Sequence, residues 1–260
     1  MKNKKYIFAI IMFCVVVGVI YAIAMCFPQK QSQIIILGVA IVAVILWMIG
    51  KMINMVRLNK IMSAPIPLLY EEKRPDLYIE EMEKISSKVH SKQQKDLIRI
   101  NVAAAQVYNG EFQKSLDILE QVALPGQPVV HQVLVHANRV MAHYFLNQKE
   151  EVLNIVENNR SVLKKYENTS TGLVNNIIVT FAIEQLVKGE YQKSLEFLEQ
   201  LKDKKVSSIL QDVVDYLYCE CYRNLKREGE RAELKRMMLA GNLVPGIRKK
   251  LEKNSLGAEQ

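Results

Sequence analysis

Two nearly identical peptides, 79 residues apart, constrain the fold of this chain more than any other feature. The peptide Asn109–Gln121 (NGEFQKSLDILEQ) returns as Lys188–Gln200 (KGEYQKSLEFLEQ), with nine of thirteen positions identical. Self-similarity at a fixed spacing is typical of proteins that stack one supersecondary unit several times, and 79 residues is about twice the length of a helix-pair repeat. The chain is therefore predicted to contain a stack of helix pairs.

Each copy of the peptide begins at the turn between two predicted helices. An apolar, Ala-containing segment precedes each copy, over residues 98–108 and 177–187. The Gly that follows allows a tight turn with positive φ at little steric cost. Apolar residues then recur at helical spacing on the second helix, as Phe112, Leu116 and Leu119 in one copy and as Tyr191, Leu195 and Leu198 in the other.

This order of helix, Gly turn, aromatic residue, small residue and Leu resembles the tetratricopeptide repeat (TPR). Ser115 and Ser194 stand where that family has Ala, and no Trp-Leu-Gly precedes either turn. The resemblance implies a right-handed stack of helix pairs that binds other proteins.

Further helix pairs are predicted before and after the pair that turns at Gly189. Asn147 marks a turn because Asn is the usual substitute for Gly in the left-handed region, and residues 226–229 mark another. A helix opening at Pro75-Asp76 precedes the pairs, and residues 247–251 can cover their end. We expect an all-α, TPR-like α-solenoid of about four helix pairs over residues 76–253, with a frayed tail over 254–260.

Residues 1–60 are predicted to form a transmembrane hairpin. Neither Tyr6–Phe27 nor Gln33–Gly50 contains a charged residue. At ~1.5 Å per residue, each run is long enough, or nearly so, to cross a ~30 Å hydrocarbon layer as a helix. We expect helices over about 6–27 and 33–56, with Pro28–Ser32 as the turn between them and residues 61–75 as a Pro-containing linker to the repeats.

The distribution of basic residues predicts the orientation of this hairpin. Three Lys residues precede the first span and three Lys or Arg residues follow the second, whereas only Lys30 lies in the connecting turn. The positive-inside rule then places both termini and the repeat domain in the cytoplasm of a multi-pass plasma-membrane protein. A cleaved signal ending near Ala22–Ala24 is the alternative, but its apolar run exceeds the usual ~7–15 residues and a second run follows.

Net charge argues against a nucleic-acid partner. The formal charge is +8, but residues 1–60 carry seven of the 35 Lys and Arg residues and no Asp or Glu, which leaves 28 basic against all 27 acidic residues elsewhere. A nucleic-acid-binding domain would concentrate its basic charge on the folded part.

Cys219 and Cys221 lie on different faces of a predicted helix, so free thiols in a reducing compartment are expected. The Lys-, Ile- and Asn-rich composition is typical of a low-GC bacterium.

No pattern in the sequence predicts catalysis or a cofactor. Phosphate-binding Gly-rich loops, His-Glu-x-x-His, Cys-x-x-Cys and Gly-x-Ser-x-Gly are all missing from the sequence. His131, His136 and His143 share one predicted helix, but two turns separate His136 from His143, about 10 Å, which is too far for one metal ion. We therefore expect no enzyme activity, no cofactor and no metal.

The remaining polar residues of the predicted first helices are candidates for a partner-binding groove. The set is Asn101, Tyr108, His136, Arg139, His143 and Asn176. Such a surface suits an amphipathic helix or an extended peptide. The sequence thus predicts a membrane-anchored cytoplasmic adaptor that binds membrane-associated proteins and contacts the bilayer through residues 6–56. The alternatives are a subunit of a membrane enzyme complex with its site on the His131–His143 helix, and a periplasmic or extracellular repeat domain.

Overall fold

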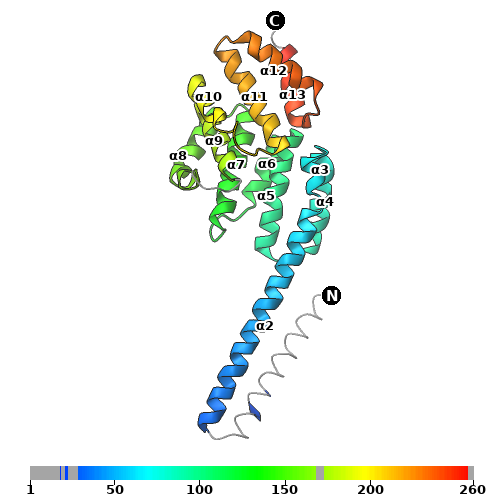
Figure 1. The fold of residues 1–260 in the computed structure, drawn as a ribbon, viewed down its shortest axis with the longest axis vertical. Helices are drawn as coiled ribbons and strands as arrows, with labels where there is room; N and C mark the ends of the chain where they lie inside the picture. The colour runs from blue at the N-terminus through cyan, green and yellow to red at the C-terminus, as the bar shows by residue number, and fades with distance from the viewer. Residues whose placement is uncertain (1–17, 19–20, 23–28, 168–172, 257–260) are drawn as a thin grey trace. The chain divides into compact units, whose positions relative to one another are not determined.

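The computed structural model describes residues 18, 21–22, 29–167 and 173–256. Within these residues every regular element is a helix, so the predicted all-α class is confirmed (Figure 1). The chain divides into two compact units, Met1–Ile61 and Met62–Gln260. The helices are α2 (Gln29–Ser63), α3 (Ile66–Tyr70), α4 (Pro75–Lys88), α5 (Lys92–Asn109), α6 (Phe112–Glu120), α7 (Val129–Phe145), α8 (Lys149–Tyr166), α9 (Leu173–Lys188), α10 (Tyr191–Glu199), α11 (Ser208–Asn224), α12 (Glu228–Ala240) and α13 (Pro245–Leu256).

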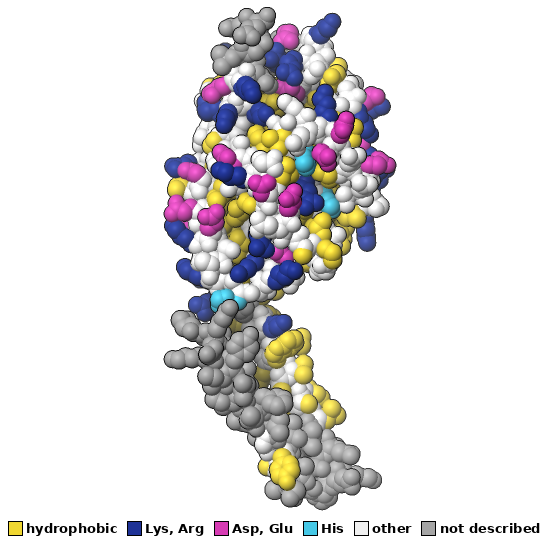
Figure 2. Space-filling model, turned by 180° about the vertical axis from the view of Figure 1, so that it is seen from behind, with side chains coloured by type: hydrophobic (Ala, Val, Ile, Leu, Met, Phe, Trp, Pro, Cys, Tyr) yellow, Lys and Arg dark blue, Asp and Glu magenta, His cyan; other side chains and the backbone are white. Residues whose placement is uncertain are grey.

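The first unit contributes one long apolar helix to the described residues. The stretch Leu37–Tyr70 is long and apolar enough to cross a membrane, and its most apolar window has no buried side chain. Figure 2 shows apolar side chains of α2 uncovered, and Leu46 and Trp47 are each 62% exposed. The predicted first span, Tyr6–Phe27, lies outside the described residues except for Gly18, Tyr21 and Ala22.

Prolines set the end of α2, and the predicted Pro-containing linker includes a short helix. Helix α2 ends at Ser63, just before Pro65, because proline lacks the amide donor that a helix interior needs. Residues 66–70 form α3, which packs on α4 and α11. At the other end α2 begins at Gln29, inside the pentapeptide expected to be a turn.

The second unit is a succession of helix pairs. The pairs are α5–α6, α7–α8, α9–α10 and α11–α12, and each second helix also contacts the first helix of the next pair where one follows. The first helices α5, α7, α9 and α11 contact one another in chain order. Their buried side chains are mostly Ile, Val, Leu and Ala, as the apolar runs in the sequence predict.

All four pairs turn in the same way. Gly110, Asn147, Gly189 and Lys226 have φ of 85°, 61°, 81° and 58°. In each turn the next residue's amide donates to a carbonyl five residues back, as Glu111 does to Gln106 at 2.9 Å and Arg227 to Tyr222 at 2.9 Å. This Schellman pattern satisfies carbonyls that the helix end would leave open. The predicted turns are confirmed, including the one at which Lys takes the place of Gly.

The two near-duplicate peptides make the same buried side-chain contact. Ser115 Oγ donates to the Ala103 carbonyl oxygen, and Ser194 Oγ donates to that of Ala182, both at 2.8 Å. Both serines are fully buried, and the two contacts are 79 residues apart in the sequence. The hydroxyl ties the second helix of each pair to the first, which gives a physical reason for Ser at this position.

Polar side chains also fasten the loops between pairs. Gln127 Nε2 donates to the buried Asp96 carboxylate at 3.0 Å. In the equivalent place, 79 residues after Asp96, Asn175 Nδ2 donates to the Lys205 carbonyl at 3.0 Å. In both cases a residue near the start of a first helix holds the loop that follows the second helix.

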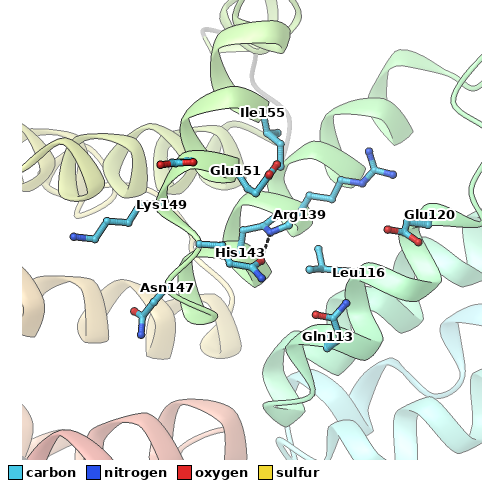
Figure 3. A pocket seen from close by; sticks show the side chains of 11 residues that line it. Gln113, Leu116, Glu120, Arg139, His143, Asn147, Lys149, Glu151 and Ile155 are labelled. Carbon is cyan, nitrogen blue, oxygen red and sulfur yellow. Dashed lines mark hydrogen bonds between the residues drawn. The ribbon is translucent and has the colours of Figure 1, made fainter.

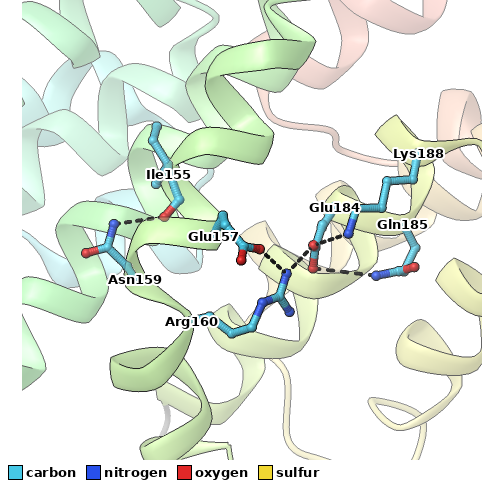
Figure 4. A network of polar contacts seen from close by, with 7 residues as sticks. All are labelled: Ile155, Glu157, Asn159, Arg160, Glu184, Gln185 and Lys188. Carbon is cyan, nitrogen blue, oxygen red and sulfur yellow. Dashed lines mark hydrogen bonds and ion pairs between the residues drawn. The ribbon is translucent and has the colours of Figure 1, made fainter.

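One buried carboxylate joins the second and third pairs (Figure 4). Glu184 of α9 is 2% exposed and accepts from Arg160 of α8 and from Lys188. Arg160 also reaches Glu157 at 3.5 Å. A buried charge is costly unless it is paired, so the two cations make this carboxylate tolerable inside the stack.

The two ends of the stack meet, which the sequence does not predict. Helix α13 packs on both α5 and α11, and α3 packs on α11. Lys73 Nζ lies 2.7 Å from Asp212 Oδ1, and the Val244 amide donates to Asp212 Oδ2 at 3.0 Å. Asp212 therefore links the α3–α4 turn, α11 and the segment before α13.

Candidate functional site

A surface hollow of about 840 Å³ lies between the second helices α6 and α8, with α7 behind it (Figure 3). Helix α6 presents Gln113, Leu116 and Glu120 on one face, since these positions are three and four residues apart. The hollow is lined by Gln113, Leu116, Glu120, Arg139, His143, Asn147, Gln148, Lys149, Glu150, Glu151 and Ile155. Amide and charged groups thus make up most of the lining, and Leu116 and Ile155 are its two apolar residues.

Arg139 is the most constrained cation of this hollow. Its Nη2 donates to the Leu119 carbonyl at 3.2 Å, near the end of α6. Burial lowers the pKa of the guanidinium, and the nearby charge of Glu120 acts in the opposite direction. A guanidinium has five N–H donors, and no ion pair of Arg139 forms within the described residues. Its remaining donors can therefore serve a bound carboxylate or carbonyl group.

The two histidines near Arg139 differ in their surroundings. His143 lines the hollow, and its Nδ1 lies 2.6 Å from Gln148 Oε1 across the α7–α8 turn. His136 is 8% exposed, and burial together with Arg139 lowers its pKa to about 4. His136 is therefore neutral near pH 7 and leaves Arg139 as the charged group of this part of α7.

The six residues predicted to share a groove are separated. Arg139 and His143 lie together in the hollow, and His136 is next to Arg139. Tyr108 is buried at the end of α5, where burial and the nearby Tyr70 and Asp212 raise its pKa. Asn101 and Asn176 are half-buried on α5 and α9, and neither lines the hollow.

Several lining residues were not predicted from the sequence. Ile155 is apolar, yet it is partly exposed at the hollow. Gln113 and Glu151 lie on exposed helix faces, and the sequence does not show which helices lie beside these faces. The one available signal was the helical spacing of Gln113, Leu116 and Glu120, which places them on a single face of α6.

The acidic side chains of the hollow do not form a metal site. Within the described part of the chain, no three His, Cys, Asp or Glu side chains come close enough together to hold a metal ion. Cys219 and Cys221 are buried free thiols whose pKa values are raised by burial to about 12 and about 11. Thiols with raised pKa values are poor nucleophiles at neutral pH, since the thiolate is the reactive form.

A comparison of the chain with family models, curated proteins and solved structures gives no match.

Proposed function

We propose that this protein is a membrane-anchored, TPR-like helical-repeat protein without catalytic activity that binds a protein partner. The four left-handed turns and the paired Ser115 and Ser194 contacts support a repeated unit. The observation that carries the binding function is the hollow between α6 and α8, in which Arg139 forms no ion pair with a described residue and keeps donors available.

The hollow suits an extended segment of a partner protein. Its amide groups can pair with a peptide backbone, and the partly exposed Ile155 can contact an apolar side chain. Arg139 favours a segment that also carries a carboxylate, because charge-assisted hydrogen bonds to a guanidinium are strong and directional. Basic and acidic side chains are interspersed on the face seen in Figure 2, which supports a protein partner over a nucleic acid.

The membrane part of the proposal rests on α2. Its most apolar part has no buried side chain among the described residues, and hydrocarbon would cover these side chains. In the proposed topology a second span precedes it, and both termini and the repeat domain lie in the cytoplasm. Such a tether raises the effective concentration of the repeat domain for membrane-associated partners.

Photo-crosslinking tests the binding function. A photoreactive residue at Gln113 should give a discrete adduct in cells, and Arg139→Ala should weaken it. Gln192 is the matched control because it occupies the equivalent position on α10, 79 residues later, and lines no described pocket. Equal adducts at Gln113 and Gln192 would show that the hollow has no special role.

Two further experiments test the anchor and the rival function. Reporter fusions after Lys60 and at Gln31 should report opposite sides of the membrane, and identical reports would contradict the hairpin.

The rival function, an enzyme subunit with its site on α7, requires His131, His136 and His143. If the protein is an enzyme subunit, replacing the three histidines together should abolish the enzyme activity. If it is a non-catalytic binding protein, the replacement should change partner binding alone.

A further inference from the structure

A second pocket, of about 360 Å³, lies where the ends of α7, α9 and α11 meet α13. It is lined by Tyr144, Phe145, Asn147, Lys149, Leu186, Val187, Tyr191, Tyr216, Glu220, Arg223, Asn224, Lys250 and Lys253. It is distinct from the hollow between α6 and α8, although both include residues of the α7–α8 turn. The C-terminal helix α13 thus completes a pocket that the first helices alone would leave open.

The charge on this pocket is positive and unbalanced. Lys149, Lys250 and Lys253 line it, and none of the three forms an ion pair with any described residue. The only carboxylate in the lining belongs to Glu220, which is paired with Arg223. Burial and the neighbouring Lys253 and Lys249 lower the pKa of Lys250, while Glu220 opposes them.

Stabilisation of a helix end explains the position of Lys250 but not the positions of the other two lysines. Lys250 Nζ donates to the carbonyl of Phe145, the last residue of α7, and a cation at a helix C-terminus is favourable. That bond uses one of the three donors of the ammonium group. Lys149 and Lys253 have no comparable contact within the described residues, so the helix ends do not account for them.

Aromatic side chains form part of the wall of this pocket. Phe145 lies between Phe112, at 4.9 Å, and Tyr216, at 5.6 Å between ring centroids. Lys250 Nζ lies 5.3 Å from the centroid of the Phe112 ring. Tyr144 and Tyr191 complete the wall. The pocket therefore has aromatic side chains in its lining, one of them 6.0 Å from the Lys250 ammonium group.

We propose that this pocket binds a small organic phosphate, with the phosphate group held by Lys149, Lys250 and Lys253 and the organic body against the aromatic wall. Lysine binds phosphate as a point charge, and the guanidinium best suited to a carboxylate, that of Arg223, is already paired. A phosphate monoester carries about −1.5 to −2 charges near pH 7. It therefore balances three lysines that form no ion pair with a described residue better than the single charge of a carboxylate ligand would. The volume falls within the range of about 300–1,000 Å³ that is usual for small-molecule sites.

Calorimetric titration of the full-length protein in detergent tests the proposal. The probes are phenyl phosphate, inorganic phosphate and benzoate, which separate the contributions of the ring and of the phosphate. We expect phenyl phosphate to bind at least about tenfold more tightly than either of the others. Equal binding of benzoate would overturn the phosphate assignment.

Matched lysine variants locate the site. Lys253→Gln and Lys149→Gln should each weaken phenyl phosphate binding several-fold, and because neither lysine has a described partner, the fold should be unaffected. Lys249→Gln is the control, since Lys249 is exposed on the same helix and does not line the pocket. An equal loss in all three variants would show a general charge effect and no site. Binding of a phosphotyrosine peptide with no binding of phenyl phosphate would also overturn the proposal, in favour of a protein ligand.

Discussion

Gly246 of α13 lies against Gly110, the left-handed turn residue at the end of α5. A Cβ atom on Gly246 would lie 2.7 Å from the Gly110 nitrogen and 2.8 Å from the Val107 carbonyl oxygen. Both are backbone atoms that cannot rotate away. This contact joins one end of the helix stack to the other, and it is possible only because both residues lack a side chain.

Gly246→Ala should therefore destabilise the protein by about 1–3 kcal/mol, the usual cost of overpacking a close contact. Urea unfolding followed by circular dichroism measures this change. Gly229→Ala is the control, because a Cβ there has no neighbour within 4 Å, and it should leave the stability unchanged or slightly raised. A Gly246→Ala variant as stable as the wild type would mean that α13 does not dock on α5.

Asp212→Asn tests the second closing contact. Its carboxylate is 8% exposed and lies beside the ammonium group of Lys73, which is 14% exposed. Removing the charge leaves a largely buried cation unpaired, which costs about 3 kcal/mol. The control is Asp76→Asn, which breaks the exposed pair with Arg74, and that loss should stay below about 1 kcal/mol. Similar losses in the two variants would refute the role of Asp212.

Ser115→Ala and Ser194→Ala test the equivalence of the two repeats. Each change removes one buried hydroxyl that donates at 2.8 Å. Each should lower the free energy of unfolding by about 0.5–1.5 kcal/mol, the usual contribution of such a bond. The exposed Ser161→Ala on α8 serves as the control and should be neutral. Clearly different losses at the two positions would contradict their structural equivalence.

His136 should make the protein sensitive to mild acid. Its pKa is lowered to about 4 from 6.5 by burial and by Arg139. The unfolded chain takes up this proton first as the pH falls, so stability decreases between about pH 6.5 and pH 4, by up to about 3 kcal/mol. His136→Gln should remove that part of the pH dependence, as measured by urea unfolding at several pH values. The exposed His90→Gln should retain it, and a wild-type slope in His136→Gln would disprove the assignment.

Local features of the second unit could be predicted from the sequence because they depend on neighbouring residues. Periodicity places Tyr78, Met82 and Ile85 on the buried face of α4. The turn at Asn147 follows from its tolerance of positive φ. Of the residues that line the candidate site, Arg139 and His143 were predicted, but their neighbours on α6 were not. The spacing of residues along one helix does not give the distance to the next helix.

By itself the sequence determined the helix pairs, their turns and the apolar character of α2, since propensity, periodicity and repetition act over a few residues. Only the tertiary structure decided that α13 and α3 join the two ends of the stack. That closure depends on contacts such as Lys73 with Asp212, which are 139 residues apart. No local pattern encodes a pairing over that distance, because it requires the summed geometry of every helix between the two residues.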